Sequence, residues 1–404
     1  NRMSTLRRWV VIVAALATTT VIWGIVLPAF NLWAPQWITA FGSGHGEVMT
    51  ANTLNQIGMG VLAPIAGYAV GRFRVRTLML LGVLLTALAL FLISVASAMW
   101  QVTLIHALLL AAGIVLCGPL ITQVLAVRLF QENRGLAIGV VTAGAPMCSF
   151  TLPPLIGLLL VRYDWRTVEI QMGVLVLLLV PLIVLAVREM PIAKSANDDV
   201  AMLQPTMNAG GILRNRVFWG LLFAVLPLNF LFNAIYFNLG FSLADMGNGA
   251  AYTATIITVT GLISLPGVLV FGALSDRVAH LPLLIGTVAV VALTCIVAAR
   301  ADNYMVLLLD LPVMGFAIGG LMPLVAAMLA KGFGTDNFAR ANGLITPFVT
   351  LGTLGSAGAG FARDYLGSYP AAYTMMLAAL PLCLLGLWLL RKGGGTRMPA
   401  VAPA

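Results

Sequence analysis

Two ionisable side chains lie inside long apolar segments of the chain. Asp310 is six residues past Tyr304, and His106 is six residues past Trp100. A charge inside hydrocarbon is costly, and residues of this kind usually contact substrate or carry protons. Since both side-chain types can change charge in the accessible pH range, we expect Asp310 and His106 to couple protons, and His106 also to bind substrate. The alternative is that each bonds to a neighbouring helix in the outer leaflet.

Uncharged polar side chains form a stripe on one predicted helix. Asn229, Asn233 and Tyr236 follow one another at i, i+4 and i+7, which places them on a single helical face. Side-chain amides and a phenol can bind a carboxylate, a hydroxyl or an amide without net charge. We therefore predict that all three contact substrate. The alternative is hydrogen bonding between helices, which is common in membranes.

Two other segments carry polar residues at helical spacing. Asn31 continues a stripe in the first segment, and we predict that it meets substrate. Thr346 begins a stripe with Thr350 and Thr353 and is a further substrate candidate, although threonine can instead satisfy the carbonyls of its own helix. Gln56 is near the start of the second segment and suits a gate or a solvated mouth equally well.

The elements that must hold these residues are membrane helices. Of the 404 residues, 61% are hydrophobic and 9% are charged, and the mean hydropathy is +1.02. Soluble proteins carry about 25% charged residues, so this class is excluded. Apolar windows of about 18 residues or more recur along the chain, each long enough to cross about 30 Å of hydrocarbon as a helix. We predict an all-α membrane protein with twelve transmembrane helices, near residues 8–33, 47–71, 76–97, 99–127, 135–161, 167–187, 215–241, 248–273, 281–300, 304–330, 341–362 and 370–390.

The distribution of cations predicts the orientation. Eighteen of the 22 Lys and Arg residues fall on the side of the termini, and the other side has only Arg162, Arg166, Arg300 and Arg363. Cytoplasmic loops of membrane proteins accumulate Lys and Arg. We predict a multi-pass protein of the cell (inner) membrane with both termini cytoplasmic. The net charge of +9 is thus interpreted as topology and not as a sign of nucleic-acid binding.

The chain consists of two similar halves. A polar stretch divides it into an N-terminal six-helix bundle at 1–187, a cytoplasmic linker at 188–214 and a C-terminal six-helix bundle at 215–404. The sequence Gly-Tyr-Ala-Val-Gly-Arg at 67–72 has a counterpart 205 residues later, Gly-Ala-Leu-Ser-Asp-Arg at 272–277. A duplicated six-helix unit is typical of transporters, in which two bundles rock around a central site.

These two loop sequences resemble those of the major facilitator superfamily, which carry Gly-x-x-x-Asp-Arg-x-Gly-Arg after the second and eighth helices. The second copy matches at Gly272, Asp276 and Arg277, and the first keeps Gly67 and Arg72 but lacks the Asp. The resemblance implies that these five residues gate the cytoplasmic side. It also implies two bundles related by pseudo-two-fold symmetry.

The resemblance further implies which helices surround the transport path. In the superfamily the first, fourth, seventh and tenth helices line a central cavity. His106 on the fourth helix and Asp310 on the tenth would then form a pair across that cavity. The stripe that begins at Asn229, on the seventh helix, would face the same space.

Within the superfamily the chain is most similar to the monocarboxylate transporters and the oxalate/formate antiporters. The resemblance is carried by five stretches, at residues 134–139, 143–146, 152–154, 164–166 and 361–369. It implies a small organic acid as substrate. The subgroup usually has an arginine at the position of Val268, and some members have a lysine near Val349, so the usual cation for a carboxylate is missing here. An anion would have to rely on Asn and Tyr donors, helix N-termini or protonated His106.

The sequence thus predicts a secondary transporter that moves a small organic acid by alternating access, with protons or by exchange. The alternative is a proton-driven efflux pump for amphipathic or cationic compounds, with Asp310 supplying the proton or the counter-charge. A third hypothesis is a membrane receptor or scaffold that does not transport. No enzyme motif, cofactor site or metal site is expected, since there is no phosphate loop and only three His. The expected partners are the substrate, protons and membrane lipid, and the expected state is a monomer.

Overall fold

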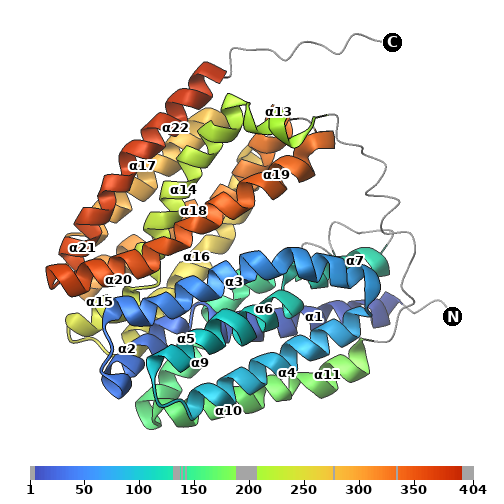
Figure 1. Cartoon of the computed structure of the whole chain (residues 1–404), viewed down its shortest axis with the longest axis vertical. Coiled ribbons are helices and arrows are strands. Elements are labelled where there is room, and N and C mark those ends of the chain that lie inside the picture. The colour runs from blue at the N-terminus through green and yellow to red at the C-terminus, as the bar shows by residue number, and fades with distance from the viewer. Residues whose placement is uncertain are drawn as a thin grey trace.

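The computed structural model describes residues 5–130, 137, 140–141, 143–187, 207–275, 278–333 and 335–393. Within these ranges all regular elements are helices, arranged in two bundles that correspond to the two halves of the chain (Figure 1). Helices suit such apolar segments because hydrocarbon cannot satisfy backbone N–H and C=O groups, and a helix satisfies them internally.

The N-terminal bundle begins with a long helix that is broken once. Pro28 lies in the turn between its two parts, and the Trp33 indole N–H donates to the Ile25 carbonyl across the break at 3.3 Å. A π-helical turn (η1) interrupts the fourth span at His106. The elements are α1 (Thr5–Val26), α2 (Phe30–Phe41), α3 (His45–Arg72), α4 (Val75–Ser94), α5 (Met99–Ile105), η1 (His106–Leu110), α6 (Ala111–Cys117), α7 (Pro119–Leu129), α9 (Gly144–Arg162), α10 (Trp165–Leu177) and α11 (Leu179–Ala186).

The C-terminal bundle repeats this plan. Its eleventh span contains a 3₁₀ turn (η2) in a threonine- and glycine-rich region. The elements are α13 (Ala209–Leu213), α14 (Arg216–Tyr236), α15 (Leu239–Asp245), α16 (Ala250–Ser275), α17 (His280–Ala298), α18 (Tyr304–Phe333), α19 (Thr335–Thr350), η2 (Leu351–Thr353), α20 (Leu354–Leu366), α21 (Tyr369–Met376), η3 (Leu377–Ala379) and α22 (Leu380–Gly393).

The predicted all-α membrane fold is confirmed. In the described residues, ten helical segments are long and apolar enough to cross a membrane. The remaining two predicted spans correspond to α9, which is a shorter apolar helix, and to α3, which has 28 residues and is more polar. The polar side chains of its first half bond to both bundles: Thr53 and Gln56 contact the other bundle, and Asn55 donates to the His106 carbonyl of its own bundle.

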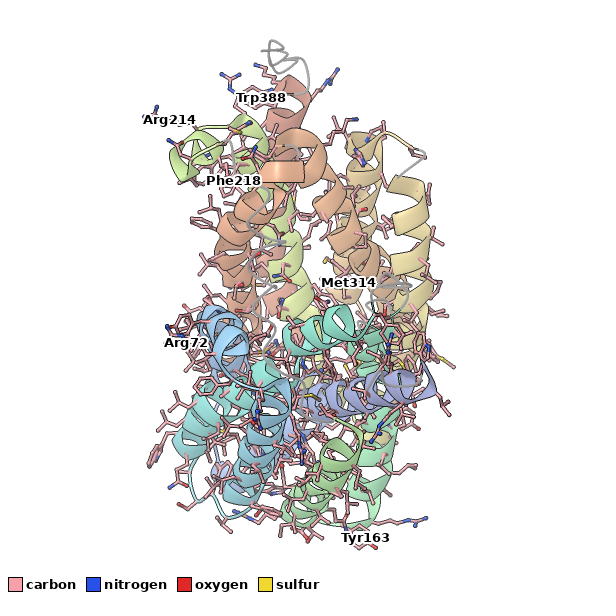
Figure 2. The ribbon with its side chains drawn as sticks, turned by 90° about the vertical axis from the view of Figure 1, so that its right-hand side faces the viewer. Arg72, Tyr163, Arg214, Phe218, Met314 and Trp388 are labelled. Atoms are coloured by element: carbon pink, nitrogen blue, oxygen red, sulfur yellow. The ribbon has the colours of Figure 1, made fainter. Side chains whose placement is uncertain are left out.

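The two bundles touch at one end and diverge toward the other. They meet where α2 packs on α15, where the start of α3 packs on α20, and along α9 and α16. They spread apart toward the end at which α7, α13 and the start of α1 lie (Figure 1). Seen from that diverging side, Arg72 belongs to the N-terminal bundle and Arg214 and Trp388 to the C-terminal bundle (Figure 2).

Small residues permit the close approach of the bundles. A Cβ atom on Gly157 of α9 would lie 2.9 Å from the Ala254 side chain of α16, and one on Gly261 of α16 would lie 2.5 Å from the Ser149 side chain of α9. Membrane helices lack a hydrophobic force between them and rely on this kind of dense packing. These glycines therefore allow α9 and α16 to pack closely where the bundles meet.

Candidate transport cavity

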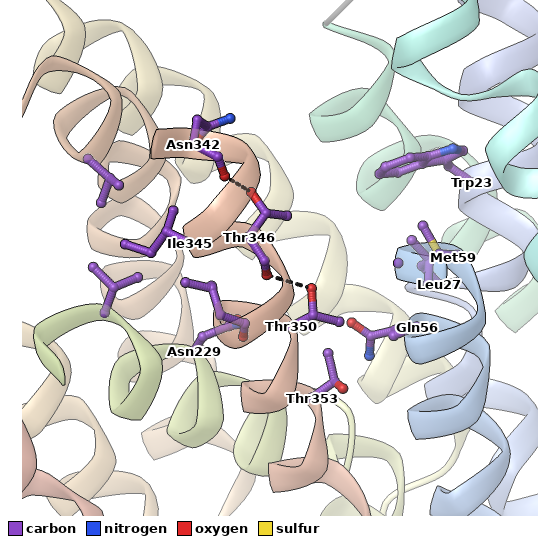
Figure 3. Close-up of a pocket in the computed structure, with 14 residues that line it drawn as sticks. Trp23, Leu27, Gln56, Met59, Asn229, Asn342, Ile345, Thr346, Thr350 and Thr353 are labelled. Carbon is purple, nitrogen blue, oxygen red and sulfur yellow. Dashed lines mark hydrogen bonds between the residues drawn. The ribbon is translucent and has the colours of Figure 1, made fainter. Parts of the chain in front are cut away.

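A cavity of about 480 Å³ lies between the two bundles. Helices α1 and α3 of the N-terminal bundle form one side, and α14, α18 and α19 of the C-terminal bundle form the other (Figure 3). Its lining consists of Trp23, Leu27, Gln56, Met59, Gly60, Val225, Asn229, Val325, Asn342, Ile345, Thr346, Val349, Thr350 and Thr353. Among these described lining residues none is ionisable. The cavity is therefore an apolar space with a few neutral polar groups.

A chain of amides crosses from one bundle to the other at the cavity. The Asn229 amide nitrogen donates to the Val349 carbonyl at 2.9 Å, and its side-chain oxygen accepts from the Asn233 amide at 3.0 Å. The Asn233 oxygen accepts in turn from the Gln56 amide of α3 at 3.1 Å. The predicted stripe thus has Asn229 in the lining and Asn233 just behind it, buried and joined to the opposite bundle.

The threonine stripe of the eleventh span also reaches the cavity. The Thr346 hydroxyl donates to the Asn342 carbonyl at 2.7 Å, and the Thr350 hydroxyl donates to the Thr346 carbonyl at 2.9 Å (Figure 3). Their hydrogens are used by their own helix, so their oxygens remain as acceptors. The Thr353 hydroxyl is buried and has no hydrogen-bond partner among the described residues.

His106 and Asp310 do not line the cavity, and the expected pairing across it is not seen. His106 is packed in the N-terminal bundle, with its ring centroid 5.5 Å from those of Phe30 and Trp37. Asp310 is buried in the C-terminal bundle near Cys295 of α17. Both side chains therefore turn into their own bundles, which helix order alone cannot reveal. Nδ1 of the histidine and Oδ2 of the aspartate lack hydrogen-bond partners among the described residues.

Two other predicted substrate residues lie outside the lining. The Asn31 side-chain oxygen accepts from the Gly240 amide at 3.2 Å, so it joins α2 to α15 at the closed end of the molecule. Tyr236 is buried, stacks on Phe232 at 4.9 Å and reaches toward Ser149 of the opposite bundle. Both residues connect the bundles at a different depth from the cavity.

The closed end is sealed by what we call the α3–α20 seam, formed by His45, Gly46, Thr53, Ser356 and Asp364. The Asp364 carboxylate at the end of α20 accepts from the His45 and Gly46 amides at 3.1 and 2.8 Å, and it lies 2.7 Å from His45 Nδ1. It thereby caps the N-terminus of α3, a helix of the other bundle. Deeper in the seam, the Thr53 and Ser356 hydroxyls are 2.8 Å apart.

The gating residues suggested by the loop motif are described only in part. Gly67 and Arg72 are exposed at the end of α3, and the Arg72 guanidinium lies 4.3 Å from the ring centroid of Tyr68. Gly272 belongs to the last turns of α16. Asp276 and Arg277 lie outside the described residues.

Sequence reasoning did not assign some residues that the structure places at key points. Met59 and Gly60 of α3 line the cavity together with Gln56, for which the sequence suggested a gate or a solvated mouth, and the i, i+3, i+4 spacing of the three residues was a usable signal. Glu169 of α10 is 1% exposed, with Oε2 lacking a partner among the described residues. It stands near the edge of its predicted span, where hydropathy does not distinguish a buried carboxyl from a solvated one.

Two bundles of membrane helices around a central cavity define a polytopic transporter. Residues 9–357 and 242–401 match the Major Facilitator Superfamily, and the chain belongs to this family. It is 28% identical over 380 residues to monocarboxylate transporter 13 of Bos taurus, covering 92% of this chain and 86% of that protein. It is 25% identical over 376 residues to monocarboxylate transporter 11 of Mus musculus, covering 90% of this chain and 83% of the relative. These relatives are membrane transporters and not enzymes.

Solved structures support the same fold. A bacterial homologue of the human lysosomal transporter Spinster, in an inward-facing and occupied conformation, superposes with a TM-score of 0.76 at 14% identity, covering 98% of each chain. The unoccupied inward-facing form superposes with a TM-score of 0.75 at 14% identity, covering 99% of this chain and 100% of the other. At such low identity the likeness concerns the fold alone.

Proposed function

We propose that this protein is a secondary transporter that moves a small organic acid across the cytoplasmic membrane by alternating access. The observation that carries the proposal is an inter-bundle cavity closed at one end, in a chain similar to monocarboxylate transporters along nearly its whole length. Asn229, Thr346 and Gln56 are the polar residues that we assign to the substrate. The energy comes from a proton gradient or from exchange.

The orientation follows from the cations. With both termini cytoplasmic, the diverging end faces the cytoplasm and the α3–α20 seam faces outside, so the described conformation is inward-facing. Residues 1–187 and 215–404 then act as the two rocking units, joined by the linker at 188–214. The seam must open, and the diverging end must close, for substrate to reach the other side.

The second candidate function is efflux of amphipathic or cationic compounds. The apolar lining without a cation favours it, because such a cavity suits a lipophilic body. In this reading the buried Asp310 carboxyl supplies the proton or the counter-charge.

Uptake into proteoliposomes tests the first function against the second. Purified protein is reconstituted, a pH gradient is imposed, and a panel of labelled aliphatic and aromatic monocarboxylic acids is offered. Saturable uptake above that of protein-free liposomes is expected for at least one acid. No acid uptake, together with saturable binding of tetraphenylphosphonium, would overturn the organic-acid proposal in favour of efflux.

A further inference from the structure

The electrostatic character of the cavity restricts the form of any acid that enters it. None of the described lining residues carries a charge, and the walls include Trp23, Leu27 and Met59 on one side and Ile345 and Val349 on the other. A carboxylate buried without a counter-charge is strongly disfavoured, and buried acids respond by taking up a proton. The cavity therefore favours neutral ligands.

The hydrogen-bonding groups of the cavity point to the same conclusion. The amide nitrogens of Asn229 and Gln56 each donate one hydrogen bond, to the Val349 carbonyl and to the Asn233 side chain, and each keeps a second N–H that the carbonyl oxygen of a carboxyl group can accept. The hydroxyl hydrogens of Thr346 and Thr350 are used by carbonyls of α19, which leaves their oxygens as acceptors. A carboxylate only accepts, whereas an undissociated carboxyl group also offers an O–H donor. That donor matches the threonine oxygens.

We propose that the cavity binds the substrate acid in its undissociated form, so that the transported proton travels on the substrate. This inference rests on the proposed organic-acid function and adds the chemical form of the ligand. The carboxylate takes up a proton from water on one side, the neutral acid crosses, and the O–H bond breaks again on the other side. One proton thus crosses with each acid molecule, and no carboxyl group of the protein has to bind it.

The size and walls of the cavity define the body of the ligand. About 480 Å³ between an indole, a thioether and branched aliphatic side chains fits an aliphatic or aromatic body of several carbons. The ligand class is therefore a weak monocarboxylic acid with an apolar body, and its neutral amide should be an effective mimic.

Binding of matched compounds to the purified protein tests the proposal without membrane diffusion. A panel of aliphatic and aromatic acids, headed by benzoic acid, is compared with the corresponding amides and sulfonates between pH 5 and 8. For a bound acid, the apparent Kd in total acid should rise about tenfold per pH unit above the pKa of that acid, because the undissociated fraction falls by that factor. The amides should bind independently of pH, and the sulfonates should not compete.

The outcomes separate this inference from the function on which it rests. An apparent Kd that stays constant with pH, or competition by sulfonates, would overturn the neutral-ligand inference while transport of acids stands. Amide binding without uptake of any acid would support the neutral site and contradict the organic-acid function. Absence of binding by every acid and amide would overturn both.

A charge placed in the lining provides a second test. Met59→Lys puts a cation at the α3 side of the cavity, and Met59→Gln is a control of similar length without charge. The lysine variant should bind acids with little pH dependence and should admit the sulfonates, while the glutamine variant should keep the wild-type pH dependence and still exclude the sulfonates, whatever its affinity for the acids. Equal pH dependence in all three proteins, with the sulfonates still excluded from the lysine variant, would contradict the proposal.

Discussion

At the residue scale, the amide chain of Gln56, Asn233 and Asn229 is a polar connection that joins both bundles beside the cavity lining. Asn233 is its central member, because it accepts from Gln56 and donates to Asn229 at 3.1 and 3.0 Å. Loss of the Asn233 amide leaves Gln56 without an acceptor and Asn229 without a donor. An unsatisfied buried polar group of this kind costs about 1–3 kcal/mol of stability.

Substitution of Asn233 by leucine should therefore weaken substrate binding. Asn233→Leu has nearly the same volume but cannot hold Asn229 and Gln56 in place, so we expect KM to rise about tenfold, which corresponds to about 1.4 kcal/mol. Initial uptake rates over a range of substrate concentrations measure this change. Thr255→Val is a matched control, because Thr255 is exposed and its hydroxyl donates to the Ala251 carbonyl of its own helix, α16. An unchanged KM in Asn233→Leu would show that the amide chain does not contribute to substrate binding.

The position of Asp310 leads to a prediction about coupling. Its carboxyl is buried in the C-terminal bundle and does not line the cavity, and a proton carried by the substrate needs no such group. Asp310→Asn preserves the shape of the side chain, so uptake driven by a pH gradient should stay within about twofold of wild type. Loss of pH-driven uptake, with normal exchange between substrate on the two sides, would make Asp310 the coupling group and would favour the efflux mechanism.

At the scale of elements, the α3–α20 seam depends on a cap that one bundle supplies to a helix of the other. The Asp364 carboxylate accepts two backbone amides at the start of α3. Close approach at this point also needs glycine, because a Cβ atom on Gly360 would lie 2.9 Å from Gly46 Cα. In the proposed transport cycle, opening of this end would break the cap and separate these glycines.

Neutralising the cap should shift the protein toward the outward-open state. Asp364→Asn removes a charge-assisted helix cap of about 1–2 kcal/mol, so the outward-open fraction should rise about 5- to 30-fold. Labelling of a Thr353→Cys reporter by a membrane-impermeant maleimide from the outside measures that fraction. Asp245→Asn is the control, because Asp245 pairs with Arg363 within the C-terminal bundle, at 3.1 Å. Equal labelling in both variants would show that the cap does not hold the gate.

The sequence predicts the membrane helices better than it predicts which side chains of different helices pack together. Hydropathy is sufficient for the membrane spans because a span needs about 20 apolar residues whatever it packs against. Helical spacing likewise placed Asn229 and Thr346 on faces that reach the cavity. It could not place His106, whose ring packs against Phe30 and Trp37, because spacing within one helix does not specify the side chains of another.

At the scale of the whole molecule, two bundles that touch at one end and diverge at the other expose the cavity to one side only. Asn342 lies in the cavity lining on α19 and is itself exposed. Under the proposed alternating access, solvent should reach Asn342 from one side of the membrane in this conformation and lose that access when the bundles change orientation.

Access to Asn342 should therefore depend on side and on ligand. In right-side-out vesicles, Asn342→Cys should react with a membrane-impermeant maleimide only after the vesicles are opened to expose the cytoplasmic face. Addition of a transported acid should slow that reaction severalfold, because the bound molecule fills the lining. Leu6→Cys, at an exposed position near the N-terminus, provides the control that should be insensitive to the acid. Labelling of Asn342→Cys from the outside, without opening of the vesicles, would show that the orientation is the opposite of the proposed one.

The neutral lining of the cavity also determines how the membrane potential acts on the carrier. Moving one elementary charge through 100 mV exchanges about 2.3 kcal/mol with the electric field. The described lining moves no fixed charge when it changes sides, and an undissociated acid adds none. If the acid crosses undissociated as proposed, the voltage across the membrane does no work on the ligand or on this lining. Accumulation of such an acid should then follow the pH difference, about tenfold per pH unit, and should collapse wherever the two sides have equal pH even if the membrane stays fully energised.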